Sequence, residues 1–134
     1  MKILIVDDEA AICRALAAKL RGHEVVVETD PIQALARLHG ELDDEPFDVV
    51  VSDYSMRGMD GIQLLAAAKA LCVPPIVILM SGYEEVVTAA LAADAVLLKP
   101  FTTRELLAAI DDTKEARTRR STKRIPRFGV VAHA

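Results

Sequence analysis

The chain alternates between short aliphatic runs and longer stretches with helical spacing, and this alternation limits the folds that it can adopt. Val, Ile and Leu predominate in the short runs, as is typical of buried β-strands. The expected strands are residues 2–7, 24–28, 47–52, 75–80 and 95–98. The expected helices are residues 9–20, 31–40, 61–71 and 84–92, and a last one that begins after residue 102. Five consecutive strand–helix units predict an α/β fold, a five-stranded parallel sheet with helices on both faces.

Two of the expected helices carry clear start signals. Asp30 precedes Pro31, which places a capping side chain before a proline at the first helical position. Thr102 and Glu105 have the spacing of a capping box, in which each side chain binds the backbone N–H of the other residue. Between the third strand and its helix, residues 54–60 are expected to form a loop rich in Gly and Met.

Length and composition predict a single domain that does not insert into a membrane. The 134 residues are enough for a single ordinary domain, and 52% of them are hydrophobic. No apolar run reaches the roughly 18 residues of a membrane helix, and the first apolar run is too short for a signal peptide. We therefore expect a cytoplasmic protein without membrane insertion.

Charge is distributed unevenly along the chain. Residues 1–112 carry 9 Lys and Arg against 19 Asp and Glu, a net charge of −10. Residues 113–134 carry 7 against 1, a net charge of +6. The acidic body argues against a nucleic-acid site on residues 1–112, whereas the basic tail has the charge to bind nucleic acid or an acidic partner.

Reactive side chains follow four of the five expected strands. Asp7 and Asp8 end the first strand, Asp53 follows the third, Ser81 the fourth and Lys99 the fifth. Because the carboxyl ends of parallel strands share one edge of the sheet, these groups should meet there. Each of them alone is commonly a turn, cap or surface residue; their placement together predicts a site.

The predicted chemistry is phosphoryl transfer. Carboxylates that meet at one edge tolerate ionisation only beside a cation, and oxygen ligands favour Mg²⁺. Asp53 is then the natural nucleophile, a carboxylate that forms an acyl phosphate. Lys99 can reach across the sheet edge as a positive charge, and Ser81 can donate a hydrogen bond to a phosphoryl oxygen.

Four segments of the chain carry a further signal: residues 3–9, 51–61, 80–83 and 97–101. Together they resemble the receiver domain of response regulators, over residues 1–116. The resemblance implies a doubly wound, flavodoxin-like sheet of order 2-1-3-4-5. It also implies a two-component phosphorelay, in which Asp53 accepts a phosphoryl group from a phosphohistidine on a sensor histidine kinase or a histidine phosphotransfer protein.

The resemblance assigns roles to individual residues. Asp8, Asp53 and the backbone carbonyl of Ser55 would bind Mg²⁺, with Asp7 acting through water, while Lys99 and Ser81 would bind the transferred group. The Lys99–Pro100 peptide would be cis. Phosphorylation would pull Ser81 inward and signal through the face formed by helix four, strand five and helix five, towards an unknown target protein. Such a protein promotes its own phosphorylation and dephosphorylation but is no turnover enzyme.

The chain departs from the family pattern at three points. Val96 stands where the family has an aromatic switch residue, so we expect activation without aromatic rotation. Arg57 stands where the family usually has proline. The segment between Ser81 and Lys99 is shorter than usual by about one helical turn, roughly four residues, which predicts a truncated helix four.

Residues 117–134 are interpreted as a basic C-terminal tail, too short for a helix-turn-helix domain, so the chain resembles a stand-alone receiver. Two other functions remain open. A pseudo-receiver would be an interaction module that takes no phosphate. A phosphohydrolase of the haloacid dehalogenase kind would have its nucleophile on the first strand and an Asp two residues later, where this chain has Glu9.

Overall fold

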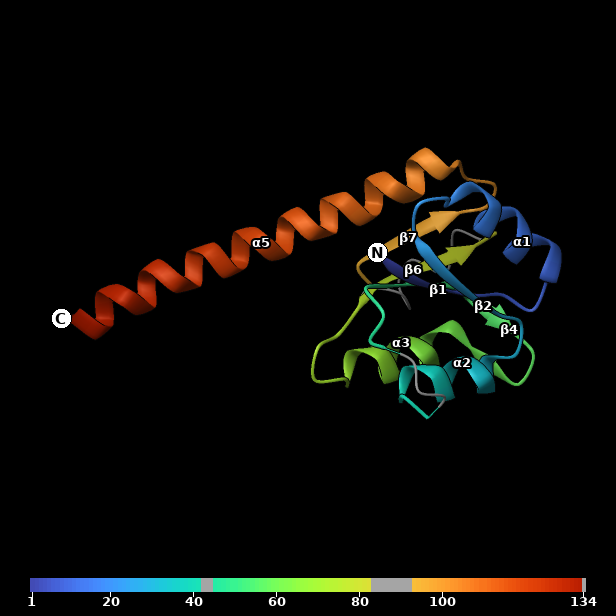
Figure 1. Ribbon diagram of the computed structural model, residues 1–134, viewed down its shortest axis with the longest axis horizontal. Coiled ribbons are helices and arrows are strands. Elements are labelled where there is room, and N and C mark those ends of the chain that lie inside the picture. The colour runs from blue at the N-terminus through green and yellow to red at the C-terminus, as the bar shows by residue number, and fades with distance from the viewer. Residues whose placement is uncertain (42–44, 83–92, 134) are drawn as a thin grey trace.

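A five-stranded parallel sheet forms the centre of the molecule (Figure 1). The computed structural model describes residues 1–41, 45–82 and 93–133. The strands of the sheet are β1 (Lys2–Val6), β2 (Glu24–Glu28), β3 (Val49–Asp53), β6 (Ile76–Ser81) and β7 (Ala95–Leu98). Their order across the sheet is β2-β1-β3-β6-β7. In chain order of these five strands this is 2-1-3-4-5, so the predicted topology is confirmed.

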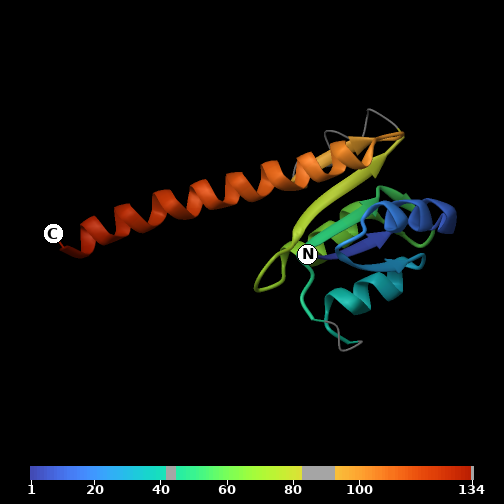
Figure 2. The same ribbon diagram turned by 45° about the horizontal axis from the view of Figure 1, so that its top comes forward.

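Helices cover both faces of the sheet (Figures 1 and 2). They are α1 (Ala10–Lys19), α2 (Pro31–Leu38), α3 (Gly61–Lys69) and α5 (Thr103–His133). Alternate residues of β1 enter two separate cores: Ile3 and Ile5 pack with α1 and α5, while Leu4 and Val6 pack with α2 and α3. This alternation explains why the strand is apolar throughout. The helix expected at residues 84–92, and with it the expected truncation of helix four, lies outside the described residues.

Both capping signals are confirmed. The Asp30 carboxylate accepts a hydrogen bond from the Ile32 N–H at 2.9 Å, and Pro31 is the first residue of α2. Before α5, the Glu105 N–H donates to Thr102 Oγ1 and the Thr102 N–H donates to Glu105 Oε1, each at 3.1 Å. Sequence therefore placed these two helix starts correctly, since caps depend on local contacts alone.

The stretch after β3 is more ordered than the loop expected from sequence. It contains a short antiparallel hairpin of β4 (Ser55–Met56) and β5 (Met59–Asp60), joined by Arg57 and Gly58. Gly58 has φ +83°, a conformation that L side chains rarely adopt. Asp60 then begins α3 with a capping box that it shares with Gln63. The sequence predicted only a loop rich in Gly and Met here and did not identify the hairpin.

The last helix runs without interruption across the predicted boundary between body and tail. α5 continues from Thr103 to His133, and its later part projects away from the sheet (Figures 1 and 2). The division into residues 1–116 and 117–134 therefore coincides with no break in the backbone. No helix among the described residues combines the length and apolar character needed to cross a membrane.

Arg117 forms hydrogen bonds between α5 and the body, just before the part of α5 that projects away from the sheet. Its guanidinium donates to the carbonyl oxygens of Pro74 and Pro75 at 3.0 and 3.1 Å, and contacts Asp94 Oδ2 at 3.3 Å. The same Asp94 oxygen accepts a hydrogen bond from the Val77 N–H at 2.8 Å. The contacts of the body thus extend at least one residue past its predicted end.

Arg117→Met should lower the free energy of unfolding by about 1 kcal/mol, because it removes hydrogen bonds from two carbonyls and a mostly buried carboxylate but keeps the apolar stem. Urea unfolding monitored by circular dichroism would measure the loss. Arg119→Met, an exposed position two residues further along α5, is the matched control. Equal stabilities of the two variants would show that the Arg117 contacts contribute nothing to folding.

Candidate functional site

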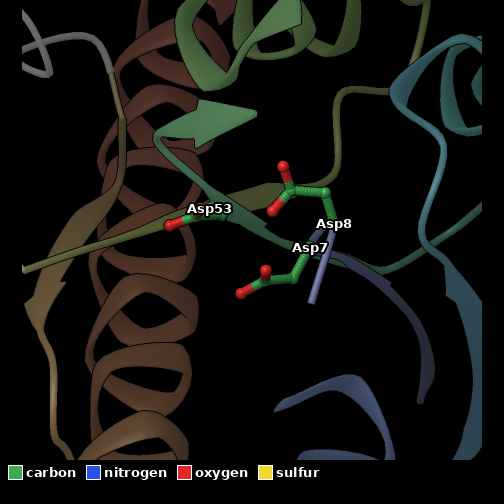
Figure 3. Close-up of side chains that lie close together, drawn as sticks. All are labelled: Asp7, Asp8 and Asp53. Carbon is green, nitrogen blue, oxygen red and sulfur yellow. The ribbon is translucent and has the colours of Figure 1, made fainter. Parts of the chain in front are cut away.

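Three carboxylates lie together at the carboxyl-terminal edge of the sheet (Figure 3). Asp7 and Asp8 directly follow β1, and Asp53 is the last residue of β3. One oxygen atom from each residue lies within 4.8 Å of those from the other two. Like charges this close repel each other unless cations compensate them. Because carboxylate oxygens are the ligands that suit a hard divalent cation, the cluster fits Mg²⁺.

Lys99 brings a positive charge into this cluster. Its Nζ lies 3.0 Å from Asp53 Oδ1 and 3.1 Å from Asp7 Oδ2. The residue follows β7, and its backbone N–H donates to the carbonyl oxygen of Ser81 at 2.7 Å. The Lys99–Pro100 peptide is cis. The Lys99 ammonium group therefore connects the carboxyl-terminal ends of β1, β3 and β7, where Asp7, Asp53 and Lys99 were predicted to lie together.

Burial and the contact between Lys99 and its carboxylate partners act in opposite directions on the pKa values of Asp53 and Lys99. Burial raises the pKa of the Asp53 carboxyl, Lys99 lowers it in part, and the charges of Asp7 and Asp8 raise it further. Burial by itself lowers the pKa of Lys99, but the contacts with Asp53 and Asp7 outweigh it, so this pKa is raised. Lys99 is therefore a protonated cation at neutral pH, held against a carboxylate whose ionised form burial disfavours.

Backbone N–H groups hold the other two carboxylates. The Glu9 N–H donates to Asp7 Oδ1 at 2.9 Å, and the Arg57 N–H donates to Asp8 Oδ2 at 3.3 Å. Asp7 is fully buried. Ser55, whose carbonyl oxygen is expected to bind the metal ion, begins β4 two residues after Asp53. The hairpin thus reaches the acidic cluster through a backbone contact that sequence reasoning did not identify.

Gly61 allows the backbone of the site to pack closely. A Cβ atom at this position would lie 2.6 Å from the Asp53 carbonyl oxygen and 3.0 Å from Tyr54 Cα. The Gly61 N–H donates to the carbonyl oxygen of Tyr54. The start of α3 therefore touches the end of β3, which only a residue without a side chain permits. A glycine directly after a helix cap was the available signal in the sequence, because glycine is a poor helix former.

Comparison with known proteins identifies the family. The family model described as the response regulator receiver domain matches residues 3–111. The chain belongs to this family. The receiver domain resembles the sensory transduction protein RegX3 of Mycobacterium tuberculosis, with 35% identity over 113 residues. It also resembles the transcriptional regulatory protein ZraR of Escherichia coli, with 36% identity over 115 residues.

These relatives are longer than the present chain. Each alignment covers 81% of this chain, but only 48% of RegX3 and 25% of ZraR. Among solved structures, a response regulator receiver domain protein from Clostridium thermocellum has a TM-score of 0.74 at 27% identity, covering 87% of this chain and 96% of that one. TrrA of Thermotoga maritima, solved in complex with Mg²⁺–BeF, has a TM-score of 0.72 at 25% identity, covering 84% of this chain and 97% of that one.

The two expected switch positions lie on neighbouring strands of the receiver domain. Ser81 is the last residue of β6 and only 2% exposed. It comes one residue after Met80, which lies opposite Asp53 in the sheet register. Val96 lies on β7 opposite Leu79, and its partly buried side chain packs against the core on the α2–α3 face. An aliphatic side chain therefore occupies the position at which the resemblance implies an aromatic switch residue.

Proposed function

We propose that this receiver domain accepts a phosphoryl group on Asp53 in a Mg²⁺-dependent reaction. The donor would be a phosphohistidine on a sensor histidine kinase or a histidine phosphotransfer protein. The observation that carries the proposal is the position of Lys99 Nζ, 3.0 Å from Asp53 and 3.1 Å from Asp7. An ammonium group so placed can neutralise charge on a group that arrives at Asp53.

The proposed transfer needs few steps. A carboxylate oxygen of Asp53 attacks the phosphorus atom of the donor. The new O–P bond forms as the P–N bond to the donor imidazole breaks, and the electron pair of that bond stays on the imidazole nitrogen. Positioning and charge compensation supply most of the catalysis in such transfers, and Lys99 provides both for the phosphoryl oxygens.

The metal ion would be held by Asp8, Asp53 and the Ser55 carbonyl, with Asp7 acting through water. When bound, Mg²⁺ supplies further neutralisation of the phosphoryl oxygens. The support from the structure is the trio of carboxylates whose oxygens lie within 4.8 Å of one another. The support from a relative is TrrA, which was solved with Mg²⁺–BeF.

The proposed result of phosphorylation is a conformational change that another protein recognises, and no compound is released. Ser81, at the end of β6, would donate a hydrogen bond to a phosphoryl oxygen on Asp53. We expect that movement of Ser81 changes the face formed by β7, α5 and the helix predicted at residues 84–92, and that a downstream protein binds this face. With Val96 on β7, this change would proceed without rotation of an aromatic side chain. The domain would then act as a phosphoacceptor that promotes its own phosphorylation and dephosphorylation, without a turnover substrate.

A direct test is the mass of the intact protein after incubation with acetyl phosphate. We expect one phosphoryl adduct with Mg²⁺ and none when EDTA removes the metal ion, because the carboxylates cannot accept another anion without the cation. Peptide mapping should place the adduct on the segment that contains Asp53. A folded protein that gains no adduct from acetyl phosphate or from histidine phosphodonors would instead be a pseudo-receiver.

A further inference from the structure

Arg57 occupies a turn position that does not itself require arginine. It is the first of the two residues that join β4 to β5, and Gly58 follows with φ +83°. A positive φ at the second turn residue occurs in type II turns, which commonly have proline at the first position, and in type I′ turns, which need a positive φ at that position as well.

The backbone N–H of Arg57 makes the contact that proline would remove. It donates to Asp8 Oδ2 at 3.3 Å, across 49 positions of sequence. This hydrogen bond connects the tip of the hairpin to the end of β1. Proline has no N–H and could not make it. A non-proline residue at this turn thus gives Asp8 a partner that the usual family sequence does not offer.

The contact completes a set of donors around the acidic cluster. Lys99 contacts Asp53 and Asp7, and the Glu9 N–H holds the other oxygen of Asp7. Asp8 receives its hydrogen bond from Arg57. A carboxylate can accept several hydrogen bonds, so Asp8 retains capacity for a cation while the N–H is bound. Groups that fix the orientation of metal ligands increase metal affinity, because less conformational freedom is lost on binding.

We propose that Arg57 is a positioning residue for the metal site, which orients Asp8 for Mg²⁺ through its backbone N–H. The inference rests on the magnesium site of the proposed function. The guanidinium of Arg57 has a separate effect, because Arg57 lines a surface hollow together with Asp8, Glu9 and Asp30. A positive charge there opposes the binding of a cation. Backbone and side chain of Arg57 therefore act on metal affinity in opposite directions.

Two substitutions separate these effects. Arg57→Ala removes the guanidinium but keeps the N–H, and Arg57→Pro removes both. We expect Arg57→Ala to bind Mg²⁺ at least as tightly as the wild type. Arg57→Pro should bind Mg²⁺ at least about tenfold more weakly than Arg57→Ala, the loss expected when a metal ligand loses a hydrogen bond that orients it. Titration of the ¹⁵N-labelled proteins with MgCl₂, followed by amide shifts, gives each Kd without any phosphorylation.

The outcomes are distinguishable. Equal Mg²⁺ affinities of Arg57→Pro and Arg57→Ala, in variants with wild-type metal-free melting temperatures, would overturn the positioning role. A wild-type protein without saturable Mg²⁺ binding would instead overturn the magnesium site itself. If Arg57→Pro does not fold, Asp8→Ala keeps the inference testable. The Arg57 amide proton should then move upfield, because it loses its carboxylate acceptor, and an unchanged shift would show that the contact is absent in solution.

Discussion

Asp53→Asn should gain no phosphoryl group from acetyl phosphate, with or without Mg²⁺. The amide cannot act as the nucleophile, and no other carboxylate in the described part of the cluster has the same position against Lys99. Asp7 shares the ammonium contact, but it is fully buried and its oxygens bind the Glu9 N–H and Lys99. Intact-mass analysis against the wild type measures the effect, and we expect complete loss of the adduct.

The loss should not result from unfolding. Burial raises the pKa of Asp53 in the folded chain, so its ionised form is less favourable there than in the unfolded chain. Above the unfolded pKa, this ionisation reduces stability, and a neutral amide removes that cost together with the repulsion from Asp7 and Asp8. We therefore expect Asp53→Asn to melt at or above the wild-type temperature at pH 7 without metal ion. Asp112→Asn, at an exposed position on α5, is the matched control and should be phosphorylated normally. An adduct on folded Asp53→Asn would place the acceptor at another residue.

The sheet and the positions of its reactive residues could be predicted because they depend on short-range patterns. The period of the aliphatic runs sets the strands, and a parallel sheet brings all strand ends to one edge. Asp7, Asp53 and Lys99 could therefore be placed together before any distance was known. The strand register determines which of these residues lie next to each other. Asp53 lies opposite Met80, and β7 ends opposite Ser81.

The features that sequence reasoning missed depend on backbone atoms and on their contacts with residues far away in the sequence. The β4–β5 hairpin has only two residues in each strand, too few to show alternation. The donation from Arg57 to Asp8 involves a backbone N–H, which every residue except proline has. The contacts of Arg117 with Pro74 and Pro75 likewise end on backbone carbonyls. Side-chain patterns carry no information about such partners, so the sequence could not predict which atoms Arg117 contacts.

Gly61→Ala should destabilise the protein by about 2–3 kcal/mol, because the new Cβ would overlap atoms that cannot move aside. It would lie 2.6 Å from the Asp53 carbonyl oxygen and 3.1 Å from Leu79 Cδ2. The nearest atom belongs to the backbone of the central strand β3, whose neighbours on both sides are paired along its length. The expected decrease in melting temperature is roughly 10 °C. Thermal unfolding followed by circular dichroism measures it.

The same substitution should also slow phosphorylation, because relief of the overlap requires β3 and α3 to separate at Asp53. Gly82→Ala is the matched control, since a Cβ there would meet no atom within 4 Å among the described residues and the backbone is not in the left-handed region. We expect Gly82→Ala to leave the melting temperature almost unchanged. If Gly61→Ala were as stable as Gly82→Ala, α3 would have to start further from β3 than the structure places it. The short distance between the two elements would then not be what keeps the Asp53 carboxylate beside Lys99.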